Sequence, residues 1–310
     1  MAQDMNGKDI ISIHELSREE IDQILYTSHV LKMKNKLGEL YHPLKGKSLG
    51  MIFQKSSTRT RVSFEVGMWQ LGGYALFLSA NDLQLKRGET IADTARNLSR
   101  YLDGIMIRTY NHQDIVDFAE YSSKPVINGL TDLLHPCQVL SDIFTIQEKK
   151  QDLKGLKVAY LGDGNNMAHS LMFGGAKMGM EISICSPSGF EPDPEITRLA
   201  RLDASQTGGK IVIEDDPYRA VQEADIIYTD VWTSMGMEGE EEKRVESFSR
   251  YQVNSALLEK AKDNVLVMHC LPAHRGEEIT DEVIDGPHSI VFDQAENRLH
   301  VQKAIMALII

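Results

Sequence analysis

Apolar residues along this chain occur in two alternating patterns. Short continuous apolar runs alternate with longer segments in which apolar residues recur at helical spacing. The runs predict strands at 48–53, 74–79, 104–108, 125–128, 157–161, 181–185, 211–214, 225–229, 264–268 and 289–292. Because most connections are long enough to hold a crossover helix, the pattern predicts parallel sheets with helices on both faces.

The predicted strands fall into two groups. Ten strands are many for one sheet, and a polar segment at 147–154 separates the first four from the last six. We therefore expect an α/β chain of two domains, each a parallel sheet flanked by helices, with residues 1–150 in the first and 151–293 in the second. Periodic segments at 17–37 and 294–308 predict an N-terminal and a C-terminal helix. The length of 310 residues also suits two domains.

A basic, hydroxyl-rich segment at 57–61, Ser-Thr-Arg-Thr-Arg, lies where a predicted strand gives way to a helical pattern. A helix N-terminus offers free backbone N–H groups and the positive end of the helix dipole. With two arginines added, these groups predict a pocket for a phosphate dianion. An ordinary helix cap with solvated arginines remains the alternative interpretation of this segment taken alone.

Three further polar clusters each follow a predicted strand. The segment 135–138, His-Pro-Cys-Gln, opens a helical pattern, and proline suits the first helical position. Its histidine and glutamine are three residues apart, so both lie on one face of that helix. The segment 230–236, Asp-Val-Trp-Thr-Ser-Met-Gly, and the segment 269–272, His-Cys-Leu-Pro, are the other two clusters.

Seven residues suited to chemistry lie at or just beyond the carboxyl end of a predicted strand. They are Ser57, Gln84, Arg108, His135, Asn166, Asp230 and Cys270. Open parallel sheets bind their ligands along this edge. The agreement between the layout and the chemistry therefore predicts an active site there.

The four clusters together resemble the motifs of the aspartate/ornithine carbamoyltransferase family, and the resemblance covers nearly the whole chain. In that family the Ser-Thr-Arg-Thr segment binds carbamoyl phosphate, and the His-Pro-x-Gln segment binds its carbamoyl group. The Ser-Met-Gly loop is similar to the loop found in the ornithine branch of the family, and relatives acting on putrescine lack it. The cysteine of His-Cys-Leu-Pro is also similar to the ornithine branch, and it is a proline in relatives acting on aspartate.

The resemblance implies an activity and a chain path. The activity is transfer of the carbamoyl group of carbamoyl phosphate to the δ-amine of L-ornithine, giving L-citrulline and phosphate in arginine metabolism, with synthesis or breakdown left open. The C-terminal helix, about 294–310, is implied to return to the first domain.

The resemblance also assigns site residues. Those implied for carbamoyl phosphate are Ser57, Thr58, Arg59, Thr60, Gln84, Arg108, His135, Pro136, Cys137, Gln138, Cys270, Leu271 and Arg298. Those implied for ornithine are Asn166, Asp230, Ser234 and Met235. Arg108 and His135 would polarise the carbamoyl oxygen, whose negative charge grows in the transition state. Cys270 would hydrogen-bond the attacking amine, whereas the side chain of Cys137 is expected to pack in the core.

The implied mechanism is direct attack of the amine, with no covalent enzyme intermediate and no metal or organic cofactor. Cys270 and Asp230 are too few ligands for a structural zinc site, and the Leu271–Pro272 bond is a candidate for the cis form. Gln84 resembles a residue that reaches into a neighbouring subunit, although loop glutamines are commonly exposed. This implies a homotrimer with shared active sites, and further assembly stays open.

The composition limits which classes of binding partner and which cellular compartment we expect. The net charge of −12 argues against a non-specific nucleic-acid binder. No apolar stretch approaches the ~20 residues of a membrane span, and the N-terminus carries no apolar signal run. Three cysteines without metal-site spacing suit a reducing compartment, so we expect a cytoplasmic protein.

Other functions remain as alternatives. The turn Gly162-Asp163-Gly164 after a strand resembles the start of a dinucleotide site, which would indicate a nicotinamide-dependent dehydrogenase. However, Met167 stands where the third glycine belongs, and the next strand ends at Cys185 without an acidic residue. Putrescine or another amine is an alternative acceptor. A binding-only paralogue is disfavoured, because every residue of the phosphate and carbamoyl clusters is present.

Overall fold

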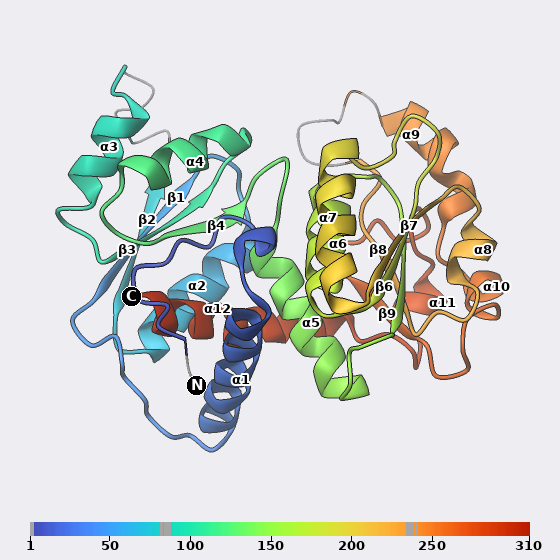
Figure 1. Cartoon of the computed structure of the whole chain (residues 1–310), viewed down its shortest axis with the longest axis horizontal. Helices are drawn as coiled ribbons and strands as arrows, with labels where there is room; N and C mark the ends of the chain where they lie inside the picture. The colour runs from blue at the N-terminus through green and yellow to red at the C-terminus, as the bar shows by residue number, and fades with distance from the viewer. Residues whose placement is uncertain (1–2, 81–82, 84–87, 234–238, 240) are drawn as a thin grey trace. The chain divides into compact units, whose positions relative to one another are not determined.

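A computed structural model describes residues 3–80, 83, 88–233, 239 and 241–310. The chain divides into two compact units, Met1–Phe144 with Glu296–Ile310, and Thr145–Ala295. Figure 1 labels most of the helices and strands of both.

Unit 1 contains a four-stranded parallel sheet in the order β2-β1-β3-β4. Its strands are β1 (Ser48–Phe53), β2 (Tyr74–Ser79), β3 (Gly104–Arg108) and β4 (Val126–Leu130). Its helices are η1 (Ile13–Glu15), α1 (Arg18–Lys36), α2 (Thr58–Gln70), α3 (Ile91–Leu98), α4 (His112–Tyr121), the start of α5 (Pro136–Lys150) and most of α12 (Val291–Ile309). The central strand β3 is buried along its whole length, whereas the edge strand β2 is partly exposed.

Unit 2 contains a five-stranded parallel sheet in the order β7-β6-β5-β8-β9. Its strands are β5 (Lys157–Leu161), β6 (Glu181–Cys185), β7 (Lys210–Glu214), β8 (Ile226–Thr229) and β9 (Leu266–His269). Its helices are α6 (Asn166–Lys177), α7 (Pro194–Thr207), α8 (Pro217–Val221), α9 (Glu241–Phe248), η4 (Ser249–Tyr251), α10 (Ser255–Leu258) and α11 (Asp281–Ile284). The two parallel sheets and their flanking helices confirm the predicted α/β class.

One predicted strand is wrong. Residues 289–292 do not form a strand: Ser289 makes a single parallel bridge with Val267, and α12 begins at Val291. The apolar run resembles a strand because it docks against β9, with Ile290 N–H donating to the Val267 carbonyl at 3.0 Å. The pairing stops there because the helical hydrogen bonds of α12 take over the backbone.

Both predicted terminal helices are present, as α1 and α12. α1 begins with a capping box, in which Ser17 and Glu20 each bond the other's backbone N–H. The end of α12 belongs to unit 1, as the resemblance implied. There it packs so closely on α2 that a Cβ at Gly67 would lie 3.1 Å from side-chain atoms of Lys303 and Met306.

Each unit has its own apolar core. In unit 1, Ile52, Ile105 and Val126 from neighbouring strands are buried together. In unit 2, Ala159, Ile227 and Val267 do the same. Among the helices of the described residues, none combines the length and apolar character needed to cross a bilayer.

Candidate active site

The hydroxyl-rich segment after β1 forms the N-terminus of α2, as predicted. Ser57 is the N-cap residue, and its hydroxyl accepts the backbone N–H of Thr60 at 3.2 Å. Thr58 and Arg59 occupy the first turn, where helix N–H groups lack partners within the helix. This end of α2 therefore favours an anion.

Arg298 reaches the same place from the far end of the sequence. Its guanidinium donates to Gln138 Oε1 at 2.5 Å and to Thr60 Oγ1 at 3.2 Å. Gln138 in turn donates to Asp142 at 2.8 Å, and this bond fixes which side of its amide faces the arginine. α12 thus brings a cation to α2 and α5 that neither helix supplies.

His135 lies among several cations. Burial is the main cause that lowers its pKa well below the usual range, followed by the charges of Arg298, Arg108, Lys55 and Arg59. The imidazole is consequently neutral at pH 7. It can donate one N–H to a ligand oxygen without giving up a proton. We call these four cations with His135 the cationic group.

Two members of the cationic group lie at or just after the carboxyl ends of strands. Arg108 is the last residue of β3 and pairs in register with Phe53, the last residue of β1. Lys55 is 7% exposed, lies 3.5 Å from Asp132 and stands 4.9 Å from the ring centre of Tyr110. Lys55 was missed from sequence, although its place two residues after a strand at the same edge was a usable signal.

The rest of the His-Pro-Cys-Gln segment has a structural role at the start of α5. Pro136 is the first residue of that helix, as its fixed φ favours. Cys137 is fully buried, and its thiol donates to the Asn128 carbonyl at 3.3 Å. Burial raises the pKa of this thiol to about 12. Cys137 therefore packs in the core rather than facing a ligand.

In unit 2, Asp230 and Cys270 meet. They follow the neighbouring strands β8 and β9, which pair Thr229 with His269. The Cys270 thiol donates to Asp230 Oδ1 at 2.9 Å. Asp230 also lies 3.4 Å from the amide nitrogen of Asn165. We call Asp163, Asp230 and Cys270 the acidic group.

Two neighbours of the acidic group were missed from sequence. Asn166 is the first residue of α6, but Asn165 before it is the N-cap and the partner of Asp230. Tyr160 donates to Asn165 Oδ1 at 3.3 Å. Burial, then Asp230, Asp163 and Cys270, hold the pKa of Tyr160 well above its usual range. A tyrosine inside an apolar strand gave no signal of this role.

Hydrogen bonds of the His269 side chain stabilise the turn that carries Cys270. The Leu271 N–H donates to His269 Nδ1 at 2.8 Å, and His269 Nε2 lies 2.9 Å from Glu278 Oε1. Since Nδ1 accepts a hydrogen bond, the N–H of this imidazole is at Nε2, and it donates a hydrogen bond to Glu278. Leu271 has φ of 55°, a region rare for residues other than glycine, and the Leu271–Pro272 bond is cis.

The same bonds argue against a metal ion at this turn. Ligand atoms of Asp230, His269 and Cys270 lie within 4.8 Å of one another. Yet both ring nitrogens of His269 are already engaged, so the imidazole has no lone pair left for an ion.

Arg244 ties the loop after β8 to the turn after β5. Its Nη1 donates to Asp163 Oδ2 at 2.7 Å and to the Trp232 carbonyl at 2.9 Å. Burial raises the pKa of Asp163 and the bond to Arg244 opposes that rise. Ser234 and Met235 of this loop, and Gln84 after β2, lie outside the described residues.

The glycine-rich turn after β5 packs against its own chain. A Cβ at Gly164 would lie 2.2 Å from the backbone nitrogen of Pro192, and Gly164 N–H donates to the Phe190 carbonyl. This close approach explains the glycine without a dinucleotide. The β6 strand ends at the buried Cys185, so no carboxylate is placed there for a ribose.

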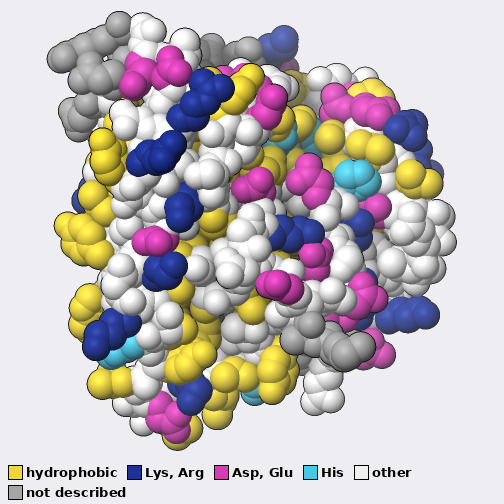
Figure 2. All heavy atoms as spheres, turned by 60° about the vertical axis from the view of Figure 1, so that its left-hand side comes forward, with side chains coloured by type: hydrophobic (Ala, Val, Ile, Leu, Met, Phe, Trp, Pro, Cys, Tyr) yellow, Lys and Arg dark blue, Asp and Glu magenta, His cyan; other side chains and the backbone are white. Residues whose placement is uncertain are grey.

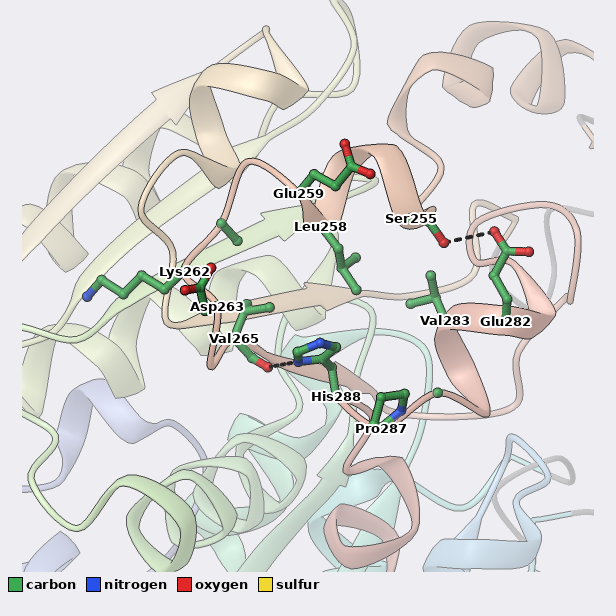
Figure 3. Close-up of a pocket in the computed structure, with 12 residues that line it drawn as sticks. Ser255, Leu258, Glu259, Lys262, Asp263, Val265, Glu282, Val283, Pro287 and His288 are labelled. Carbon is green, nitrogen blue, oxygen red and sulfur yellow. Dashed lines mark hydrogen bonds between the residues drawn. The ribbon is translucent and has the colours of Figure 1, made fainter.

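A cavity of about 390 Å³ in unit 2 lies away from these residues. Figure 3 shows His288 bonded to the Val265 carbonyl and Ser255 bonded to Glu282 along its wall. Val265 precedes β9, whereas Cys270 follows it. The cavity therefore belongs to the opposite edge of the sheet from the acidic group.

Family models match both parts of the chain. The description "Aspartate/ornithine carbamoyltransferase, carbamoyl-P binding domain" applies to residues 8–148. The description "Aspartate/ornithine carbamoyltransferase, Asp/Orn binding domain" applies to residues 154–309.

Individual relatives match over the full length. The ornithine carbamoyltransferase of Thermococcus kodakarensis is 56% identical over 309 residues, covering 100% of this chain and 98% of that protein. The anabolic ornithine carbamoyltransferase of Pyrococcus furiosus is 55% identical over 309 residues, with the same coverage. A solved structure of the Pyrococcus furiosus ornithine carbamoyltransferase superposes with a TM-score of 0.97, covering 99% of this chain and 98% of that one.

Proposed function

We infer that this chain, which belongs to the aspartate/ornithine carbamoyltransferase family, transfers the carbamoyl group of carbamoyl phosphate to the δ-amine of L-ornithine. The products are L-citrulline and phosphate. The observation that carries this conclusion is the identity of 56% over the full chain to a protein named ornithine carbamoyltransferase. A second relative of similar identity is named anabolic, which fits a place in arginine biosynthesis.

Carbamoyl phosphate is assigned to the first domain, residues 1–150 with the helix at about 294–310. The family description of residues 8–148 and the cationic group support this assignment. Ser57, Thr58, Arg59 and Thr60 would hold the phosphate through N–H groups, hydroxyls and a guanidinium fork.

The cationic group also suits the chemical step. The carbamoyl oxygen gains negative charge as the tetrahedral species forms, and fixed donors there lower the barrier. Arg108 and the neutral His135 are the assigned donors, supported by their burial and mutual proximity. Arg298, bound to Thr60 and Gln138, is assigned to the same ligand.

Ornithine is assigned to the second domain, residues 151–293. Asp230 suits the cationic end of the amino acid, and Asn166 can hydrogen-bond its carboxylate. The neutral δ-amine attacks the carbonyl carbon, so a C–N bond forms and the C–O bond to phosphate then breaks. The amine proton leaves with the phosphate. Cys270, already bound to Asp230, would orient the amine without forming a covalent bond.

The assay for this function measures citrulline from carbamoyl phosphate with ornithine, putrescine or aspartate as acceptor. We expect ornithine to give the highest kcat/KM. A site that binds a carboxylate leaves buried polar groups unpaired when putrescine enters, which costs affinity. A higher kcat/KM for putrescine would overturn the acceptor but leave the carbamoyl phosphate assignment standing.

A homotrimer with shared active sites is the proposed assembly. Val62 and Val66 on α2 and Phe77 on the edge strand β2 are exposed in the single chain. An exposed apolar surface beside a sheet edge favours contact with another chain. Figure 2 shows exposed hydrophobic side chains along the left and lower margins of the face it draws. Gln84 follows β2 in sequence, which suits a residue donated to a neighbour.

Mixing two inactive variants tests this assembly. Arg59→Ala and Gln84→Ala trimers should each be impaired. In a cyclic trimer, one chain's Arg59 faces the next chain's Gln84, so each mixed trimer regains about one intact site. Mixing without prior dissociation is the control and should regain none. Mixed trimers that stay as inactive as their parents would refute the shared site.

A cytoplasmic location completes the proposal. Cys137, Cys185 and Cys270 are all free thiols in the structure, which suits a reducing compartment.

A further inference from the structure

A second cavity, of about 620 Å³, lies in unit 1. The end of α1, the segment that follows it, the end of α2 and Lys303 of α12 line its wall. No residue of the cationic group lines it. Its volume is within the range of small-molecule sites.

The lining is basic although the whole chain is acidic. It includes Lys34, Lys45, Lys303 and His42, against Glu39 as its carboxylate. Lys34 pairs with Glu39 at 2.8 Å. Among the described residues, Lys45 forms no ion pair. The cavity therefore carries excess positive charge.

Lys303 is the strongest indication of a ligand. It is 4% exposed, and its ammonium donates to the neutral Gln70 Oε1 at 2.7 Å. Within the described part of the chain, no carboxylate pairs with it. A buried ammonium without a counter-ion is costly, and an anion in the cavity would offset that cost. Burial accordingly lowers the pKa of Lys303.

A neighbouring histidine responds to this positive charge. His300, one turn before Lys303 on α12, has its pKa lowered to about 4 by burial, with Lys303 and Lys32 adding to the effect against Glu296. Its buried Nδ1 has no hydrogen-bond partner among the described residues. The Lys32 ammonium donates to the neutral side chain of Asn297 at 2.8 Å.

The rim of the cavity is aromatic. Trp69 is 73% exposed and Tyr41 is 47% exposed, and the Lys34 ammonium lies 5.6 Å from the Tyr41 ring centre. Flat, exposed rings beside cations suit a ligand that joins a planar ring to an anion.

We propose that this cavity is a second ligand site, separate from the transfer site, for a small organic phosphate that carries a planar ring. The phosphate lies toward Lys303, and the ring lies against Trp69.

Phenyl phosphate is the probe, titrated into the whole assembled protein at constant ionic strength. The chain has two tryptophans, and Trp232 is buried, so Trp69, which lines the cavity, should report binding by a saturable fluorescence change. Inorganic phosphate should bind more weakly and phenol should not bind. Calorimetry on Arg59→Ala should still detect the site, because Arg59 belongs to the transfer site.

Lys303→Met should weaken phenyl phosphate at least tenfold, since a charge-assisted hydrogen bond is lost. Lys36→Met, an exposed lysine outside the cavity, is the matched control and should bind normally. If Lys303→Met fails to fold, Lys34→Met/Lys45→Met should show the same weakening. Absence of saturable binding, loss of binding in Arg59→Ala, or unchanged affinity in the lysine variants would each overturn the proposal.

Discussion

The two units each carry a group of candidate site residues, and the two groups have opposite charge. In unit 1, Arg59, Arg108 and Arg298 lie near a neutral, buried His135. In unit 2, Asp163 and Asp230 lie near Cys270. Burial is the main cause that raises the pKa of Tyr160, and the charges of Asp230 and Asp163 raise it further. Both groups stand at the carboxyl ends of parallel strands, so the same architecture supports either sign of charge.

The charge difference corresponds to the two proposed substrates. Carbamoyl phosphate is a dianion, and ornithine carries a positively charged α-ammonium group. The cationic group and the acidic group also differ in how their side chains are held in place. Side chains from α2, α5 and α12 bond one another in unit 1, whereas in unit 2 the loop after β8 is tied back by Arg244. Variants can therefore affect one substrate and spare the other.

The largest effect is expected from Arg59→Ala, which should weaken carbamoyl phosphate binding and leave ornithine binding unchanged. Each charge-assisted hydrogen bond lost costs ~1.5–3 kcal/mol, so affinity should fall by about tenfold or more per bond. Separate titrations with the two substrates measure this, and Arg100→Ala, an exposed arginine, is the control. Undiminished carbamoyl phosphate affinity in the folded variant would break the comparison.

Arg244→Gln should instead affect ornithine selectively. KM for ornithine should rise by about tenfold, while the affinity for carbamoyl phosphate should not change. The variant releases the Trp232 carbonyl and leaves the Asp163 carboxylate buried without its cation, which typically costs ~3–5 kcal/mol of stability. Thermal unfolding and steady-state kinetics measure both effects. Adding Asp163→Asn should recover part of the stability, and a double variant no more stable than the single one would contradict the pairing argument.

Cys270→Ala should lower kcat several-fold and shift the pH profile without abolishing activity. The thiol orients the amine through Asp230 and is not a nucleophile in this mechanism. Cys185→Ala, a buried thiol outside the acidic group, controls for general loss of stability. Mass spectrometry during turnover should find no carbamoyl adduct on Cys270, and an adduct formed and consumed at the turnover rate would sink direct attack.

His300→Gln should produce the smallest effect, on the pH dependence of stability. Because the folded pKa of about 4 lies below the ordinary 6.5, the unfolded chain binds the proton first, and stability falls as pH drops from 6.5 toward 4. The wild type should therefore lose about 1–2 kcal/mol more than the variant between pH 7 and pH 5. Urea unfolding at both values measures this, with His29→Gln as control. Equal losses in variant and wild type would show that His300 is not the source.

Much of the fold followed from local patterns. Nine of the predicted strands are present because buried runs and turn residues give strong local signals. The tenth was wrong because an apolar run that docks beside β9 through Ser289 has the same composition as a strand. Sequence pattern does not record how far backbone pairing continues.

The site residues divide in the same way. Ser57 and Pro136 could be placed from sequence because caps and first-turn positions depend on near neighbours. Asn165 and Tyr160 could not, since their importance comes from the side chains that lie across the sheet, whereas the position of Lys55 after a strand was a signal that could have been used. Glu278 had no sequence signal, because its partner His269 is brought to it by the turn between them.

The sequence by itself determined the alternation of strands and helices, the clusters at strand ends and the resemblance to a family, because these depend on residues close together in the chain. Only the tertiary structure decided that Arg298 bonds Thr60, that burial and then four nearby cations lower the pKa of His135, and that Cys270 bonds Asp230. Distances and burial arise when distant segments pack, and they set the charge and proton state of each group.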